Sequence, residues 1–166
     1  MNFLNISNAF SLSENFINNL DQTDINNIEI QTHIVSGLVL LIVSEYEIYF
    51  ENLFNQRASR CGDTHVCNYI KKSLSNNFRS PDLGKINETL KRFDQSYQQQ
   101  IIDYQSQNPQ EKSAWDTLLQ ARHYIVHKHG NVQVTFNELK TIYTNSKGII
   151  NAVEHILGIN QAQVST

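Results

Sequence analysis

The stretch IVSGLVLLIVSEYEIYF, Ile34 to Phe50, decides the fold class of this 166-residue chain. Apolar residues occupy nearly all sides of a helix between Ile34 and Val43, which predicts a helix at the centre of the protein. We expect it to run from Asp24 to about Ala58, as one helix or as two joined end to end. The uncharged part of this stretch ends before Glu45, so it is shorter than the roughly 20 apolar residues needed to cross a bilayer. The sequence therefore predicts a buried core helix and no contact with a membrane.

Helical patterns also fill the chain on the C-terminal side of this segment. We predict helices over residues 62–75, from Pro81 or Asp82 onward, from Pro109 to Gly130, and from Thr135 to about Leu157. Thr135 and Glu138 have the spacing of a capping box. No stretch alternates with period two, so a sheet is not expected. We therefore predict an all-α, up-and-down bundle of about five to six helices. It forms a single domain over residues 1–166, with a core at about 24–158 and frayed ends before about Ser11 and after Gly158.

The composition limits which functions the chain can have. Charged residues make up only 17% of the chain and the net charge is −3, which excludes the broad basic surface that non-specific DNA binding requires. Two cysteines, Cys61 and Cys67, are too few for a disulfide-built scaffold, and no signal peptide is recognised, so a reduced cytoplasmic setting is expected. His65 lies between the cysteines, but they are six residues apart and lack a second ligand pair, so no metal site is predicted there.

A cluster of basic and imidazole side chains occurs in RHYIVHKHGN, Arg122 to Asn131, where one arginine is followed by three of the six histidines. On an ideal helix Arg122 and His127 are rotated by about 140° and displaced by roughly 7.5 Å. They can still converge, because arginine is long and the helix is ending. His129 lies almost on the face of Arg122, whereas His123 points away from it. Geometry therefore leaves the choice between His127 and His129 open.

These residue types have the chemistry for cutting RNA. The planar guanidinium of arginine fits phosphate oxygens, and an imidazole can take a proton from a ribose 2′-hydroxyl or give one to the leaving oxygen. No metal would be required. The simpler alternative is a solvated helix end, in which cations are favourably placed near the last carbonyl groups.

Three segments together resemble a known family. ARHYIVHKHG (121–130) resembles the RX4-6H signature of HEPN-domain proteins, and in particular their RiboL-PSP-like branch. VSGLVLLIVSEYEIYFENL (35–53) resembles an earlier helix of that branch, in which a hydrophobic run leads to a glutamate followed by an aromatic residue. SPDLGKINETLKRFD (80–94) resembles its middle helix. The resemblance covers roughly Ile30 to Leu157.

The resemblance assigns roles to the motif on the penultimate helix. Arg122 matches the arginine of the family, and His127 matches its histidine because it stands three positions before Gly130. His123 occupies the place after the arginine and is expected to support the site. His129 departs from the commonest pattern, so which imidazole acts is left open.

The resemblance extends these roles to one acidic residue. Glu47 matches an acidic residue on the earlier helix that orients the basic groups of the site, with Glu45 as the nearby competitor. Arg122, Lys128 and His129 are expected to contact RNA.

As a whole, the resemblance implies an endoribonuclease that needs no metal or other cofactor and cleaves RNA by attack of the 2′-hydroxyl. It also implies the toxin of a toxin–antitoxin or phage-defence pair, with a possible antitoxin protein as partner. A homodimer is expected, in which two arginine-histidine motifs face one cleft and together create a positive groove. The alternative is a non-catalytic HEPN interaction module that partners a nucleotidyltransferase-type protein. A metal-dependent hydrolase that uses the histidine cluster ranks last.

Overall fold

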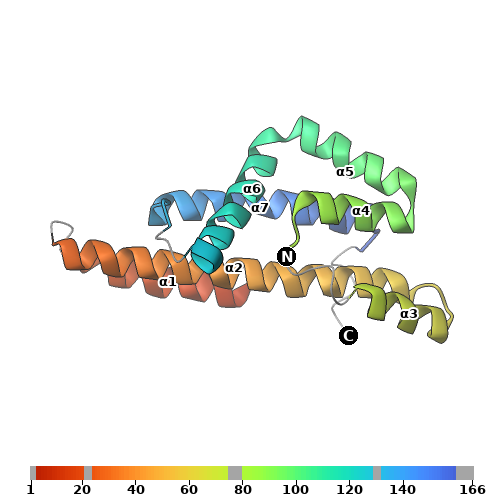
Figure 1. Cartoon of the computed structure of the whole chain (residues 1–166), viewed down its shortest axis with the longest axis horizontal. Coiled ribbons are helices and arrows are strands. Elements are labelled where there is room, and N and C mark those ends of the chain that lie inside the picture. Colours follow the sequence, from red (N-terminus) through yellow and green to blue (C-terminus); the bar gives the residue numbers. More distant parts are fainter. Residues whose placement is uncertain (1–2, 21–23, 75–79, 129–131, 160–166) are drawn as a thin grey trace.

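The computed structural model describes residues 3–20, 24–74, 80–128 and 132–159, and every regular element in these ranges is a helix (Figure 1). The helices are α1 (Leu4–Asn18), α2 (Ile25–Ser59), α3 (Thr64–Leu74), α4 (Leu83–Phe93), α5 (Gln95–Gln107), α6 (Pro109–Lys128) and α7 (Phe136–Ile156). The all-α prediction is confirmed. The described residues form seven helices, slightly more than the five to six expected.

Helix α2 is the central element, and it is one continuous helix of 35 residues. It begins at Asp24, whose side chain accepts a hydrogen bond from the Asn26 backbone N–H at 2.9 Å. Helix α1 lies beside its first part and α3 folds back along its last turns, while α6 and α7 pack on it from above in Figure 1. By length and composition alone α2 could cross a membrane. Ten of its residues are buried against the other helices, from Val35 to Ala58.

Helix α1 corrects the expectation of a frayed N-terminal segment. Ile6, Phe10 and Ile17 are buried, and the Phe10 ring lies 5.8 Å from the Phe136 ring and 5.3 Å from the Tyr143 ring on α7. The local start signal is weak, because the N-cap position has no side-chain cap hydrogen bond. Since short isolated helices are marginal in water, this helix depends on the surface that α2 and α7 provide.

The additional helix arises from a break at Asp94. Its backbone is extended, with φ −164° and ψ 134°, so α4 ends there and α5 begins at the next residue. The Asp94 carboxylate accepts a hydrogen bond from the Ser96 N–H at 2.7 Å, and this bond lowers the pKa of Asp94. The predicted capping box of α7 is present: the Thr135 N–H donates to Glu138 Oε2 at 2.8 Å, and Glu138 N–H donates to Thr135 Oγ1 at 3.3 Å.

Trp115 fixes the position of α6 over α2. It is fully buried, and its ring stacks on Tyr46 with centroids 5.2 Å apart and planes 2° apart, while Phe50 meets it edge-on. Its indole Nε1–H donates to the Pro81 carbonyl at 3.0 Å. Because residues seven apart lie on nearly the same side of a helix, this packing turns the side chain of Arg122 towards α2 as well.

Candidate functional site

Arg122 and Glu47 come together between α6 and α2. Arg122 Nη2 lies 3.2 Å from Glu47 Oε1, and the two side chains are 24% and 22% exposed. The competing carboxylate, Glu45, instead accepts a hydrogen bond from Asn5 Nδ2 at 2.9 Å. Glu45 is therefore committed to the contact with α1, and Glu47 is the acidic partner of Arg122.

Ser80 is a third member of this group, and sequence reasoning missed it. Its backbone N–H donates to Glu47 Oε1 at 2.6 Å, and its hydroxyl accepts a hydrogen bond from Arg122 Nη1. Its carbonyl accepts a hydrogen bond from Lys85 Nζ at 3.1 Å. Its φ of +54° lies in the left-handed region, which costs a non-glycine residue about 1–3 kcal/mol. Among the described residues outside glycine it alone has a positive φ, so the polar contacts hold a strained backbone.

Sequence gives only a faint signal for Ser80. The residue before a proline is restricted in conformation, and Ser80 precedes Pro81. Nothing in that local pattern points to Arg122, which lies 42 positions later. The contact depends on the tertiary packing of α6.

His123 and His127 form a separate pair on another side of α6. Both are exposed, and their ring centroids are 4.7 Å apart with planes tilted by 48°. This contact follows from their four-residue spacing, which places them on one helix face. No hydrogen bond or ion pair joins Arg122 to either imidazole within the described part of the chain. The structure thus presents two groups, an inward Arg122–Glu47–Ser80 network and an outward imidazole pair.

Three residues of the predicted motif lie wholly or partly outside the described residues. His129, expected to contact RNA, and Gly130, expected to end α6, lie outside the described residues. The backbone of Lys128 is the last of α6, but its side chain is likewise outside the description. The predicted choice between His127 and His129 therefore stays a prediction.

A metal site is not formed by the residues that the structure describes. In those ranges no three His, Cys, Asp or Glu side chains are grouped so that they could hold a metal ion. Cys61 is exposed and Cys67 is buried. This arrangement agrees with the interpretation of CGDTHVC as a loop followed by a helix with one buried cysteine.

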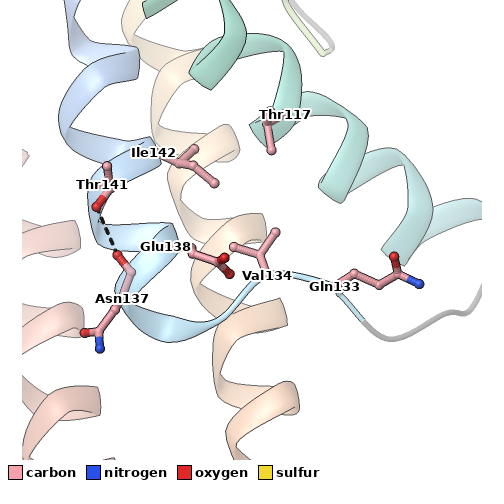
Figure 2. Close-up of a pocket in the computed structure, with 7 residues that line it drawn as sticks. All are labelled: Thr117, Gln133, Val134, Asn137, Glu138, Thr141 and Ile142. Carbon is pink, nitrogen blue, oxygen red and sulfur yellow. Dashed lines mark hydrogen bonds between the residues drawn. The ribbon is translucent and has the colours of Figure 1, made fainter. Parts of the chain in front are cut away.

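A hollow of about 520 Å³ lies between α6 and the start of α7 (Figure 2). Its only charged lining residue is Glu138, whose carboxylate is engaged in the capping box. Thr117, on the α6 wall, is five residues from Arg122, which corresponds to about 140° around the helix. The hollow is therefore separate from the Arg122 network. It is lined by Thr117, Gln133, Val134, Asn137, Glu138, Thr141 and Ile142.

The sequence of this chain matches one known protein family over nearly its whole length. A family profile described as RiboL-PSP-HEPN matches residues 4–158. No curated protein and no solved structure matches the chain. The matched range begins with α1 and ends just after α7, so it includes Glu47, Ser80, Arg122 and both imidazoles.

Proposed function

The chain belongs to the RiboL-PSP-HEPN family, and from this premise we propose that it is an endoribonuclease that needs neither a metal ion nor another cofactor. Membership by itself indicates an RNA-related nuclease or an interaction module. The observation that carries the finer proposal is the Arg122–Glu47–Ser80 network. It supplies a guanidinium that is fixed in place and about one quarter exposed, on the same helix as two imidazoles.

The network leaves Arg122 able to bind a phosphate. Guanidinium has five N–H donors, and the contacts with Ser80 and Glu47 each engage one terminal nitrogen. The remaining donors can bind phosphate oxygens and stabilise the charge that develops on the phosphorane. Because Glu47 and Ser80 hold the side chain in advance, little rotamer entropy remains to be lost when RNA binds.

The imidazole pair supplies the proton transfers. His127 takes the proton from a ribose 2′-hydroxyl, and the 2′-oxygen attacks the adjacent phosphorus. The bond from phosphorus to the 5′-oxygen breaks, and that oxygen receives a proton from His123. The products are a 2′,3′-cyclic phosphate and a 5′-hydroxyl end. The contact between the two rings, whose centroids are 4.7 Å apart, supports this assignment, because one phosphodiester could then reach both a base and an acid.

A homodimer would bring the two groups to the same phosphate. Arg122 and His127 are about 140° apart around α6, and a helix with its side chains is roughly 10–12 Å wide. Arg122 is held towards α2, which supports a site in which a single phosphodiester receives its arginine and its histidine from different chains. In the proposed dimer, Arg122 of one protomer and His127 of its partner face the same substrate.

Mixing two inactive variants tests this arrangement. Arg122→Ala and His127→Ala are each expected to abolish cleavage. If each site uses both chains, a heterodimer of the two variants has one intact site and one doubly defective site. After random exchange of subunits the mixture should recover about a quarter of wild-type activity. No recovery, in a mixture shown to contain heterodimers, would place both groups in one chain and refute the shared site.

The reaction chemistry has its own test. Cleavage of a labelled RNA should persist in excess chelator and yield 2′,3′-cyclic phosphate ends, whereas a 5′-phosphate product would contradict attack by the 2′-hydroxyl. Arg92→Ala and His33→Ala are matched controls, because both side chains are exposed surface residues that pair with a glutamate on their own helix. Both controls should cleave as the wild type does.

A non-catalytic interaction module is the second candidate, and one observation favours it: the charge of Arg122 is directed inward at Glu47. Such a module would partner a nucleotidyltransferase-type protein. The growth of cells that express the chain distinguishes the nuclease from the interaction module. If the chain is the cytoplasmic toxin of a toxin–antitoxin or phage-defence pair, its expression slows growth and Arg122→Ala relieves the effect. Equal tolerance of wild type, Arg122→Ala and His127→Ala would favour the module.

A further inference from the structure

The two cysteines lie in direct contact at the turn between α2 and α3. Cys61 Sγ and Cys67 Sγ are 2.8 Å apart, so less than about 1 Å of movement separates them from the length of a disulfide bond, about 2.05 Å. The contact results from the turn that follows α2. Gly62 has a φ of +77°, in the left-handed region that glycine adopts without strain, and it turns the chain so that α3 starts beside the end of α2.

The surroundings of the two sulfurs differ. Cys61 is exposed, and its Sγ donates to the Asp63 carbonyl at 3.4 Å. Cys67 is buried, and its Sγ donates to the Ala58 carbonyl in the last turn of α2 at 3.3 Å. The close contact with the Cys61 sulfur, together with burial, raises the pKa of the Cys67 thiol. An oxidant in solution therefore reacts first with Cys61, and Cys67 stays a protonated, buried thiol next to it.

We propose that Cys61 and Cys67 are a peroxide-reactive pair that forms a reversible disulfide within one chain. The Cys61 thiolate attacks one oxygen of a hydroperoxide, the O–O bond breaks, and the departing oxygen takes up a proton to leave as an alcohol or as water. Cys61 is now a sulfenic acid. The Cys67 sulfur then attacks the Cys61 sulfur, the S–O bond breaks, and hydroxide leaves as water with the proton from Cys67. Two sulfur atoms lose two electrons in total, and the peroxide gains them.

The disulfide would fasten α3 to the end of α2. Helix α3 packs chiefly against α2, and two of its residues, Cys67 and Leu74, are buried. Its first turn is held by Asp63, whose carboxylate accepts hydrogen bonds from the His65 and Val66 N–H groups at 2.8 and 3.2 Å. A helix attached over so small a buried surface opens locally with little cost. A covalent link in its first turn limits that opening, so oxidation stabilises α3 against local unfolding.

The experiment uses the full chain with hydrogen peroxide as the oxidant. Wild type should lose both thiols together, and its intact mass should fall by that of two hydrogen atoms. It should still run as a single chain under denaturing, non-reducing conditions, and dithiothreitol should restore both thiols. Amides of residues 64–74 should exchange with deuterium at least about threefold more slowly in the oxidised protein than in the reduced one.

Single variants identify the order of events. In Cys67→Ser, Cys61 should stop at a sulfenic acid that a dimedone-type reagent traps. In Cys61→Ser, the buried Cys67 should react with peroxide at least about tenfold more slowly than Cys61 does in the wild type.

Four results would overturn the proposal. They are independent loss of the two thiols, oxidation of Cys61 to a sulfinic acid without a disulfide, a disulfide between chains, and unchanged exchange of the α3 amides on oxidation. Tight binding of one zinc ion by the two thiols in reduced protein, with loss of peroxide reactivity at equimolar zinc, would show a metal site in its place.

Discussion

Removing the Glu47 carboxylate should cost the fold about 3 kcal/mol and release Arg122 at the same time. Glu47 accepts two contacts on one oxygen, from the Ser80 N–H at 2.6 Å and from Arg122 Nη2 at 3.2 Å. In Glu47→Ala both donors lose their acceptor. Ser80 then keeps its left-handed backbone without the bond that helps to hold it.

The magnitude follows from these two contacts. A hydrogen bond to a charged group contributes about 1.5–3 kcal/mol. The Ser80 contact is short, so we assign it about 2 kcal/mol. Both partners of the ion pair are about one quarter exposed, so solvent screening reduces that contact to about 1 kcal/mol. For a domain of this size, a total of about 3 kcal/mol corresponds to a melting temperature lower by about 6–12 °C. Glu47→Gln keeps an acceptor without the charge and should cost about 1 kcal/mol.

Urea unfolding followed by circular dichroism measures both variants, and the slope with denaturant should stay unchanged. Glu45→Ala is the matched control, because Glu45 lies two residues away, is similarly part-buried, and accepts one hydrogen bond, from the exposed Asn5. It should cost less than about 1 kcal/mol. A cost below about 0.5 kcal/mol for Glu47→Ala, or equal costs for the alanine and glutamine variants, would refute the assigned role of the carboxylate.

A double replacement separates stability from function. When one partner of a shielded ion pair is removed, the other charge is left without compensation, whereas apolar residues in both places are often tolerated. Glu47→Met with Arg122→Met should therefore lose mainly the bond from the Ser80 N–H, at a cost of about 2 kcal/mol, and still be inactive on RNA. A double variant less stable than Glu47→Ala would show that the pair mainly stabilises the bundle.

Three further predictions concern stability elsewhere in the bundle. Trp115→Phe should cost about 2–3 kcal/mol in urea unfolding, because it removes the bond from Nε1 to the Pro81 carbonyl and part of a fully buried ring. Hydrogen bonds from Thr135 lower the pKa of Glu138 below the value of about 4.3 in an unfolded chain. The ionised Glu138 carboxylate therefore adds to the free energy of unfolding above that pH, and this stabilisation is lost as the pH falls through the folded pKa. From about pH 5 to pH 3 the melting temperature should fall less for Glu138→Gln than for the wild type. Gly148→Ala would place a Cβ 1.8 Å from Glu111 Oε2, which accepts the Tyr104 hydroxyl at 2.6 Å. It should cost about 1 kcal/mol in the wild type and less in a Glu111→Ala background.

The parts of the fold that could be predicted are those that local sequence determines. Helix α2 was expected as a long central helix because a long apolar run has few other stable arrangements in water. The capping box of α7 was expected because Thr135 and Glu138 satisfy each other's backbone within one turn. The shared face of His123 and His127 likewise follows from a spacing of four residues.

The parts that were missed depend on residues far apart in the chain. Helix α1 has no strong cap, and its apolar side chains are buried because α2 lies beside it and α7 lies where Phe10 can reach it. Asp94 ends α4 and caps α5 in one residue, a dual role that the pattern FDQS does not distinguish from a continuing helix. Ser80 meets Arg122 because Trp115 holds α6 against Pro81, the residue next to Ser80. Tertiary packing decided these three features.

The balance of charge around Arg122 sets how RNA binding should respond to salt. Arg122 pairs with Glu47, and Lys85, whose Nζ also reaches Ser80, lies 3.6 Å from Asp82. These four charges cancel, so RNA experiences little long-range attraction and gains affinity mainly from close contact with the guanidinium. With one Arg122 from each protomer, about two phosphates are neutralised, and the logarithm of affinity should fall with that of salt at a slope of about −1.4.

With that slope, the affinity for RNA falls about sevenfold when salt rises from 50 to 200 mM. The affinity of a basic groove would fall by about 10³-fold or more over the same range. Fluorescence anisotropy of a labelled RNA with the His127→Ala variant measures it without cleavage. A slope steeper than about −4 would mean that further cations reach the phosphates and that the neutral surroundings of Arg122 do not govern binding.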